Sequence, residues 1–271
     1  MYVIGEQINC TRKPIARAVK KQDSERIQQV AVRQVEAGAA CLDVNGGIAG
    51  SEAAYLSWLV DVVQDAVDVP LCLDSPDAEA LALALPRCRQ RPMINSITNE
   101  TDRLNAIIPL IKEHNARIVA LCMDESGYPA SAEDRITIAG SLIERLTEAD
   151  ISLDDIYVDP AVFPVSTSTD TGVAVLDAIS TITDRYPGVH MTCGLSNVSF
   201  GLPVRLLLNR TFLTLAAGRG LDTVIADPCD AHLIAALAAT EALLGHDEYC
   251  MSYLEAHKNG HLEPEKTVLV A

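Results

Sequence analysis

The chain has 271 residues, a length that suits a single (β/α)8 barrel of about 250 residues. Apolar residues make up 49% of it but aromatic residues only 4%, so Ala, Val, Leu and Ile must fill a large core. The 21 basic and 37 acidic side chains give a net charge of −16, which argues against nucleic acid or an anionic membrane as a partner.

No segment has the pattern of an export signal or a membrane span. Residues 1–10 lack a basic start and an apolar stretch, and no uninterrupted apolar run approaches about 18 residues. The eight cysteines are scattered, without the paired spacing of a zinc site. Cys41, Cys72, Cys122 and Cys193 fall inside apolar runs, as small buried side chains do. We therefore expect a reducing, cytoplasmic setting.

Eight short runs, rich in β-branched side chains and bounded by turn residues, predict strands. They are Tyr2–Asn9, Ala39–Asn45, Pro70–Ser75, Pro92–Thr98, Arg117–Asp124, Ile156–Pro164, Val189–Asn197 and Thr223–Asp227. They begin roughly every 30 residues, the repeat of βα units in a barrel.

Helical patterns fill the intervals between these runs. Apolar stripes predict helices from Ser24 to Gly38, around Leu104–Ile111 and around Ile136–Leu146. Ser75, followed by Pro76, is expected to cap an alanine- and leucine-rich helix. The helix around Ile136–Leu146 is expected to start at Ser131–Asp134. Further helices are expected over Leu206–Leu215, and over Ala231–Leu244 with Asp230 as cap and Gly245 as stop.

The alternation runs without linker or change in composition, which predicts one domain over residues 1–271, with a short helix and tail at 247–271. The alternative is an open, doubly wound nucleotide-binding sheet. Its glycine fingerprint is missing, because Gly46, Gly47 and Gly50 match neither GxGxxG nor a P-loop. The expected fold class is α/β, a (β/α)8 TIM barrel.

Carboxylate or amide side chains stand at the end of every predicted strand, where barrel enzymes carry their active sites. They are Glu6, Asn9, Asp43, Asn45, Asp74, Asn95, Asp124, Asp159, Asn197 and Asp227. Single positions have simpler explanations, since Ser75 and Asp230 suit helix caps, Asp124 a loop and Asp227 a turn. The same chemistry at all eight ends predicts a polar site in the barrel mouth.

The chemistry of these side chains limits what the mouth can bind. No lysine or histidine ends a strand, so neither a Schiff base nor a metal site is expected. His190, inside the seventh run, is interpreted as structural. Carboxylates and carboxamides suit a neutral heterocycle, because a carboxylate accepts two parallel hydrogen bonds from an amino-pyrimidinone edge. A pterin, a purine or a sugar would meet that description.

Motifs at the strand ends resemble those of the pterin-binding methyltransferases. They are IGEQIN (Ile4–Asn9), LDVNGG (Leu42–Gly47), LCLDS (Leu71–Ser75), MINSIT (Met93–Thr98), YVDP (Tyr157–Pro160), GLSNVSFGLPVR (Gly194–Arg205) and LLNRTFL (Leu207–Leu213). The pattern is similar to methyltetrahydrofolate:corrinoid/iron–sulfur protein methyltransferases, to methylcobalamin:tetrahydrofolate methyltransferases, and to the folate domain of cobalamin-dependent methionine synthase. It covers nearly the whole chain in one order.

The resemblance implies roles for particular residues. Asp74, Asn95 and Asp159 match the triplet that hydrogen-bonds the pterin, and Asn197 matches an asparagine near N5 of the folate. Further substrate contacts are implied for Glu6, Asn9, Ser196 and Arg205. Asn197, Asp159 and Asp74 would act by orientation and electrostatics, without a covalent enzyme intermediate.

The implied reaction moves a methyl group between N5 of tetrahydrofolate and the cobalt of a corrinoid such as methylcobalamin. The corrinoid-binding motif DxHxxG is incomplete, because Asp230 and His232 begin it but Ala235 replaces the glycine. We therefore expect a separate corrinoid-binding protein that docks transiently over the mouth, and a homodimer, the usual state in the family. Gln7 stands where the corrinoid/iron–sulfur protein methyltransferases have a basic residue, whereas Phe200–Leu202 follow the methionine synthase version of the loop. The resemblance therefore does not identify one particular corrinoid partner.

Two alternatives remain. A dihydropteroate synthase would share the barrel and the pterin pocket, but it needs a diphosphate site. The segment from Asp170 to Asn197 has no lysine, and no SxRH-like ending is present. The second alternative is a pterin-binding protein without turnover, against which the complete pocket argues.

Overall fold

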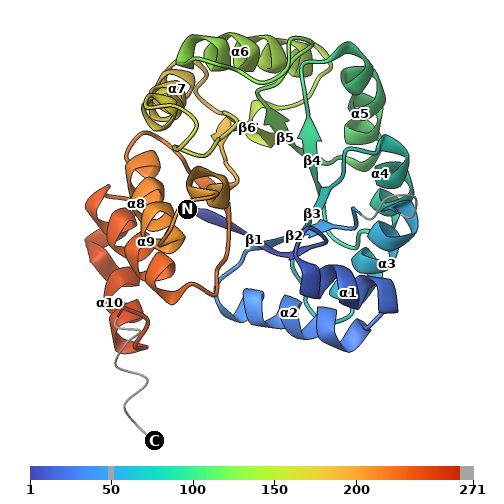
Figure 1. The fold of residues 1–271 in the computed structure, drawn as a ribbon, viewed down its shortest axis with the longest axis horizontal. Coiled ribbons are helices and arrows are strands. Elements are labelled where there is room, and N and C mark those ends of the chain that lie inside the picture. The colour runs from blue at the N-terminus through green and yellow to red at the C-terminus, as the bar shows by residue number, and fades with distance from the viewer. Residues whose placement is uncertain (48–51, 263–271) are drawn as a thin grey trace, which may run out of the picture.

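Residues 1–47 and 52–262, described by the computed structural model, form a parallel eight-stranded barrel ringed by helices (Figure 1). The strands are β1 (Tyr2–Asn9), β2 (Cys41–Asn45), β3 (Leu71–Asp74), β4 (Met93–Ile97), β5 (Arg117–Leu121), β6 (Ile156–Asp159), β7 (His190–Met191) and β8 (Thr223–Ala226). They pair in the order β7-β6-β5-β4-β3-β2-β1-β8. A parallel bridge between Gly194 and Ile225 closes the ring, which confirms the predicted TIM barrel.

Helices cover the outside of the barrel. They are α1 (Lys13–Lys21), α2 (Ser24–Glu36), α3 (Glu52–Gln64), α4 (Ala78–Ala84), α5 (Thr101–His114), α6 (Ala132–Glu148), α7 (Thr171–Arg185), α8 (Arg205–Ala217), α9 (Ala231–Leu243) and α10 (Met251–Lys258), with short 3-10 turns η1 (Leu85–Arg87), η2 (Leu153–Asp155), η3 (Leu195–Ser199) and η4 (Glu248–Cys250). Ser131 and Asp230 cap α6 and α9 as predicted. The short helix expected in the tail is α10, whereas residues 263–271 and Gly50 lie outside the described residues.

Two apolar layers hold this arrangement. The larger one fills the space between barrel and helices, and the smaller one plugs the inside of the barrel. The plug consists of Ile4, Cys41, Cys72, Met93, Val119, Tyr157 and Ile225. Because side chains alternate along a strand, the residue two positions further on also points inward. The next inward layer therefore holds Glu6, Asp43, Asp74, Asn95, Leu121 and Asp159.

Several boundaries differ from the sequence predictions. The sixth strand ends at Asp159, five residues before the predicted Pro164. The fifth strand ends at Leu121, so Asp124 lies in the following loop, where it bonds Ser126. The seventh strand is only two residues long, because the chain turns into η3 before Asn197. Ser75 is not the cap of α4, since the helix begins at Ala78 and Asp77 accepts the capping hydrogen bond from the Glu79 amide.

Helix α1 was not anticipated from the sequence. It is only nine residues long and buries only Ile15, Ala18 and Val19, so it offers few apolar positions from which a helix could be recognised. Over residues 1–47 and 52–262, no helix combines the length and apolar content needed to cross a bilayer.

Candidate functional site in the barrel mouth

A pocket of about 630 Å³ opens at the carboxyl ends of the strands. Its wall contains the eight residues to which the resemblance gave substrate contacts: Glu6, Asn9, Asp74, Asn95, Asp159, Ser196, Asn197 and Arg205. The strand-end candidates Asn45, Asp124 and Asp227 do not line it. Asp43, Thr11, Arg12, Ser96, Leu121, Gly194 and Ile225 complete the wall. The strand pairing explains this convergence, because Asp74 lies in register with Asn45 on one side and with Asn95 on the other.

Two amides orient the acids on the floor of the pocket. The Asn45 Nδ2 group donates a hydrogen bond to Asp74 Oδ2 (2.9 Å), and Asn95 Nδ2 donates to Asp43 Oδ1 (3.1 Å). With its amide nitrogen engaged in this way, Asn95 keeps its carbonyl oxygen available as an acceptor. Asp43 is 2% exposed, so it acts on a ligand chiefly through Asn95.

The loop after β6 is held beneath the pocket by a buried arginine. Arg135 is 1% exposed and donates hydrogen bonds to the carbonyls of Pro160 (2.8 Å) and Ala161 (3.2 Å). Asp159 accepts a hydrogen bond from the Ala161 amide (2.8 Å) through Oδ1. These contacts fix the Asp159 carboxyl at the end of its strand.

A second arginine holds the ends of β3 and β4 together. Arg103 donates to the carbonyls of Ser75 (2.9 Å), Pro76 (2.7 Å) and Ser96 (2.6 Å). These carbonyls follow directly after Asp74 and Asn95 in the chain, so one side chain couples the two strand ends. No local sequence pattern signals this role, because Arg103 lies on α5 and only its tertiary contacts reveal it.

The β1 side of the pocket is a charged network. Glu6 Oε1 accepts hydrogen bonds from Arg12 (2.7 Å) and from the Ser196 hydroxyl (2.8 Å). Asn9 turns its side-chain oxygen back to the Thr11 amide (2.9 Å). Gln7 points away from the pocket and is bonded to Asp227, so Asp227 supports this wall from behind.

Within residues 1–47 and 52–262, the loop after β7 carries the one predicted site residue whose side chain makes no hydrogen bond. Asn197 is exposed on η3, and no hydrogen bond of its side chain is recorded within the described part of the chain. Arg205 braces this loop by donating to the Ser196 carbonyl (2.5 Å) and to the Ser199 hydroxyl (3.1 Å). The Asn197 amide is therefore positioned by its loop but remains available to a ligand.

An aromatic annex of about 320 Å³ adjoins the pocket and shares Leu121, Asp159 and Asn197 with it. Tyr128 and Phe163 meet edge to face there, with ring centroids 5.1 Å apart. The polar pocket and the apolar annex together suit a ligand with one hydrogen-bonding ring and one apolar portion.

Burial sets the electrostatics of the site. It raises the pKa of Asp74 and of Asp159 from 3.8 to about 6 each. Burial is also the largest cause of the raised pKa of Glu6, and burial together with the neighbouring Asp74 holds the pKa of Asp43 well above its usual range. Burial likewise raises the pKa of the Cys72 and Cys193 thiols, which argues against a thiolate nucleophile.

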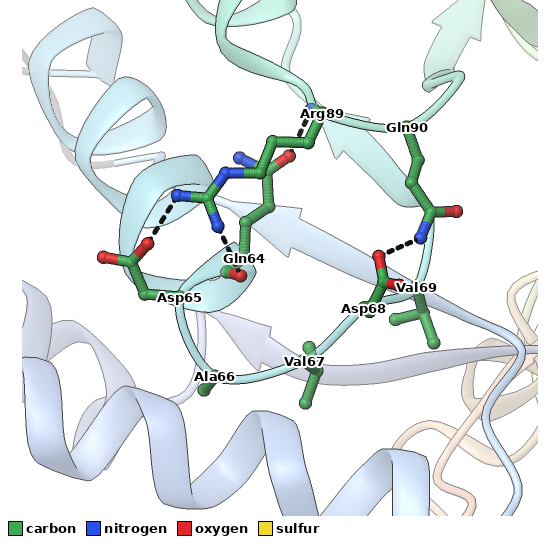
Figure 2. A pocket seen from close by; sticks show the side chains of 8 residues that line it. All are labelled: Gln64, Asp65, Ala66, Val67, Asp68, Val69, Arg89 and Gln90. Atoms are coloured by element: carbon green, nitrogen blue, oxygen red, sulfur yellow. Dashed lines mark hydrogen bonds and ion pairs between the residues drawn. The ribbon is translucent and has the colours of Figure 1, made fainter.

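The opposite end of the barrel has a hollow of about 290 Å³ between the α3–β3 connection and the start of β4 (Figure 2). Arg89 donates to the Gln64 carbonyl (2.8 Å) and to Asp65 (2.5 Å), while Gln90 bonds Asp68. These polar groups bond one another across the hollow, and Asp65, Asp68 and Arg89 are exposed, so they link two loops at the surface.

His190 has the structural role expected from the sequence. Its Nδ1 bonds Asp222 (2.6 Å), and its ring stacks on Tyr157 at 4.6 Å. This cluster lies at the amino-terminal end of the strands, away from the mouth.

Comparison with known proteins places the chain among related sequences. A family model described as pterin binding enzyme matches residues 5–227. A methylcorrinoid:tetrahydrofolate methyltransferase of Eubacterium limosum is 35% identical over 267 residues, which cover 97% of this chain and 98% of the relative. The methionine synthase of Mycobacterium tuberculosis is 31% identical over 239 residues, 83% of this chain but only 20% of that larger protein.

Solved structures show the same architecture. A dihydropteroate synthase from Yersinia pestis superimposes with a TM-score of 0.70 at 18% identity, over 90% of this chain and 94% of that one. The enzyme from Xanthomonas albilineans in complex with 7,8-dihydropteroate gives 0.69 at 21% identity, over 90% and 93%. At this level of identity the likeness shows the fold alone.

Proposed function

The chain belongs to the family of pterin-binding enzymes, and from this premise we propose that it transfers a methyl group between N5 of tetrahydrofolate and the cobalt of a corrinoid carried by a separate protein. One observation carries the proposal: Asp74, Asn95, Asp159 and the unengaged Asn197 share the wall of one pocket. The end-to-end similarity to a protein named methylcorrinoid:tetrahydrofolate methyltransferase supports it.

The proposed recognition follows from the donors and acceptors of the pocket. A pterin presents an amino-pyrimidinone edge with several N–H donors. Asp74 and Asp159 supply carboxylate oxygens, and Asn95 supplies the carbonyl oxygen left by its bond to Asp43. Glu6, Asn9, Ser196 and Arg205 form the remaining polar wall for the rest of the folate.

The proposed chemistry needs no group to be covalently attached to the enzyme. When a methylcorrinoid donates, the lone pair of N5 attacks the methyl carbon, the carbon–cobalt bond breaks, its electron pair stays on cobalt as Co(I), and the N5 proton leaves to solvent. In the reverse direction N5 must gain positive character as its methyl departs. A neutral carboxamide such as Asn197 can accept from N5–H or donate to the N5 lone pair, so it serves both directions without titrating.

The corrinoid is proposed to arrive on a partner protein. Asp230, which begins the incomplete corrinoid motif, is instead the N-cap of α9 and bonds the His232 and Leu233 amides. It also accepts two hydrogen bonds from Arg210 (2.6 and 2.9 Å). Since this aspartate is fully used inside the fold, the partner would have to present its cofactor over the open mouth, in a transient contact.

A homodimer in the cytoplasm completes the proposal. Exposed apolar side chains gather on α8, α9, η4 and α10, which lie side by side on the barrel exterior (Figure 1). Leu207, Leu243, Tyr249 and Met251 are each more than half exposed there. Such a patch suits contact with a second copy. The eight free cysteines suit a reducing compartment.

A turnover assay tests the proposed function. The protein is incubated with methylcobalamin and tetrahydrofolate, and the appearance of cob(I)alamin and 5-methyltetrahydrofolate is followed, then the reverse reaction is measured. Parallel reactions with a dihydropterin diphosphate and p-aminobenzoate test the synthase alternative. Methyl transfer without dihydropteroate formation is expected. Dihydropteroate formation, or no methyl transfer with either free cobalamin or a corrinoid protein, would contradict the proposal.

A further inference from the structure

Helix α1 concentrates positive charge in a chain whose net charge is −16. The cations are Arg12 at the N-cap and Lys13, Arg17, Lys20 and Lys21 within the helix, and no acidic residue lies among them. All five side chains are exposed. Positions 13, 17, 20 and 21 fall on one face of a helix, opposite the buried Ile15, Ala18 and Val19. Lys13, Arg17, Lys20 and Lys21 together form a cationic stripe on this face.

The fold gains little from this stripe. Like charges three and four residues apart destabilise a helix. Lys20 and Lys21 lie in the last turn, where they complement the helix dipole, but Lys13 lies in the first turn, where the dipole favours an acid. Arg12 is paired with Glu6, whereas no carboxylate partner of the stripe is recorded among the residues that the structure describes.

The stripe begins at the rim of the pocket. Thr11 and Arg12 are part of the pocket wall, and α1 follows them directly. Figure 1 shows α1 beside β1 and α2, next to the barrel. A ligand tail that left the pocket past Arg12 would therefore find these four cations on the helix that follows directly from the pocket wall.

We propose that the cationic stripe of α1 binds the γ-linked glutamate tail of the folate substrate. This inference rests on the proposed function, since it requires a folate in the pocket. The tail is a linear chain of carboxylates, and it is tethered to the ring that the pocket holds. Tethering gives the carboxylates a high effective concentration at the rim, so individually weak exposed ion pairs add up. A line of cations running outward from the pocket matches a linear polyanion.

Binding of two folates tests the tail site without needing turnover. Tetrahydropteroyl monoglutamate and pentaglutamate are titrated by calorimetry into the wild type, into Arg17→Glu/Lys21→Glu, and into the control Arg145→Glu/Arg185→Glu. The control removes two exposed cations from the last turns of α6 and α7, so both double variants change the net charge equally. Circular dichroism checks that all three proteins are folded.

We expect the wild type and the control to bind the pentaglutamate about tenfold more tightly than the monoglutamate, an advantage that high salt removes. The α1 variant should bind both folates alike. The tail site would be overturned if the wild type bound the monoglutamate and the pentaglutamate equally well. It would also be overturned if the α1 variant kept the preference for the pentaglutamate, or if the control lost it. If the charge reversal Arg17→Glu/Lys21→Glu leaves the binding of both folates unchanged and slows only methyl transfer with a corrinoid protein, the tail site is wrong and the stripe contacts that protein. Failure of both folates to bind would contradict the proposed function itself.

Discussion

Two buried acids in the mouth make ligand binding depend on pH. The carboxyls of Asp74 and Asp159 each have a pKa of about 6, raised first of all by burial. In the unfolded chain these carboxyls ionise near pH 3.8, whereas burial keeps them protonated in the folded protein up to a pH of about 6. Their contribution to stability is therefore fully present below pH 3.8 and is lost as the pH rises through about 6. A ligand that donates N–H groups binds the ionised form and offsets this cost.

We therefore expect tetrahydrofolate to bind more tightly as the pH rises from 5 to 7. The affinity should change roughly tenfold if one carboxylate must be ionised and up to about a hundredfold if both must be. Calorimetric titration across this range measures it, and Asp74→Asn should flatten one of the two steps. A pH-independent affinity in the wild type would show that these acids do not hold the ligand.

Asn197 is expected to act on the reaction rather than on binding. Its side chain is exposed and unengaged in the described structure, so Asn197→Ala should leave the fold intact. Loss of one polar contact made in the transition state should lower kcat about a hundredfold, while KM for the folate changes little. Steady-state kinetics of methyl transfer checks this split. An unchanged kcat would refute a role at N5.

At the scale of elements, the loops of the mouth are positioned by arginines on the surrounding helices. Arg103, Arg135 and Arg205 each donate to backbone carbonyls just after the strand ends. A guanidinium presents several donors in a rigid fork, which a lysine ammonium does not match. The site therefore depends on contacts between helices and loops as well as on the strand ends themselves.

Arg103 allows this dependence to be measured. Arg103→Ala should raise KM for the folate about tenfold, because the ends of β3 and β4 lose their common donor, and Arg103→Lys should restore only part of the affinity. Arg91→Ala is a matched control, since Arg91 donates to the Asn115 carbonyl (2.5 Å) and pairs with Asp155 (2.6 Å) at the other end of the barrel. The control should lower stability in urea without changing KM. Equal effects of both variants on KM would argue against a specific role of Arg103.

The strand ends could be predicted from the sequence because they combine two local signals, a short apolar run and a polar residue that follows it. The inward layer reproduces those positions at five strands, β1, β2, β3, β4 and β6. Asp124 was misassigned, since the apolar run continues past Leu121 although the strand does not. Helix α1 was missed because it is short and buries only three residues. The roles of Arg103 and Arg135 were missed for a different reason: they depend on contacts between residues far apart in the chain, which no local pattern encodes. Arg205 was predicted as a site residue, but its bonds to the Ser196 carbonyl and the Ser199 hydroxyl were not.

The two ends of the molecule divide its tasks. The mouth gathers partly satisfied polar groups around a large pocket, whereas the opposite end holds the Arg89 and His190 clusters, whose polar groups bond one another. Barrel enzymes commonly separate function and stability in this way. The exposed apolar patch over α8, α9 and α10 belongs to neither end.

We expect this patch to be the contact between two copies of the chain. Leu207→Asp combined with Leu243→Asp should convert a dimer to a monomer, because the charges would be buried without partners in the contact. Sedimentation velocity measures the change. The control Leu83→Asp replaces an exposed leucine on α4 and should leave the dimer intact. A wild type that sediments as a monomer would contradict the proposed contact.

The most direct test follows the methyl group itself. The protein is mixed, in excess, with carbon-13-labelled methylcobalamin and tetrahydrofolate, and the label is located by NMR while the cobalt is followed by absorbance. We expect the label on N5 of the folate and one cob(I)alamin formed for each methyl transferred, faster than in a protein-free mixture. Label that stays on cobalt, or transfer no faster than without protein, would contradict methyl transfer by this barrel.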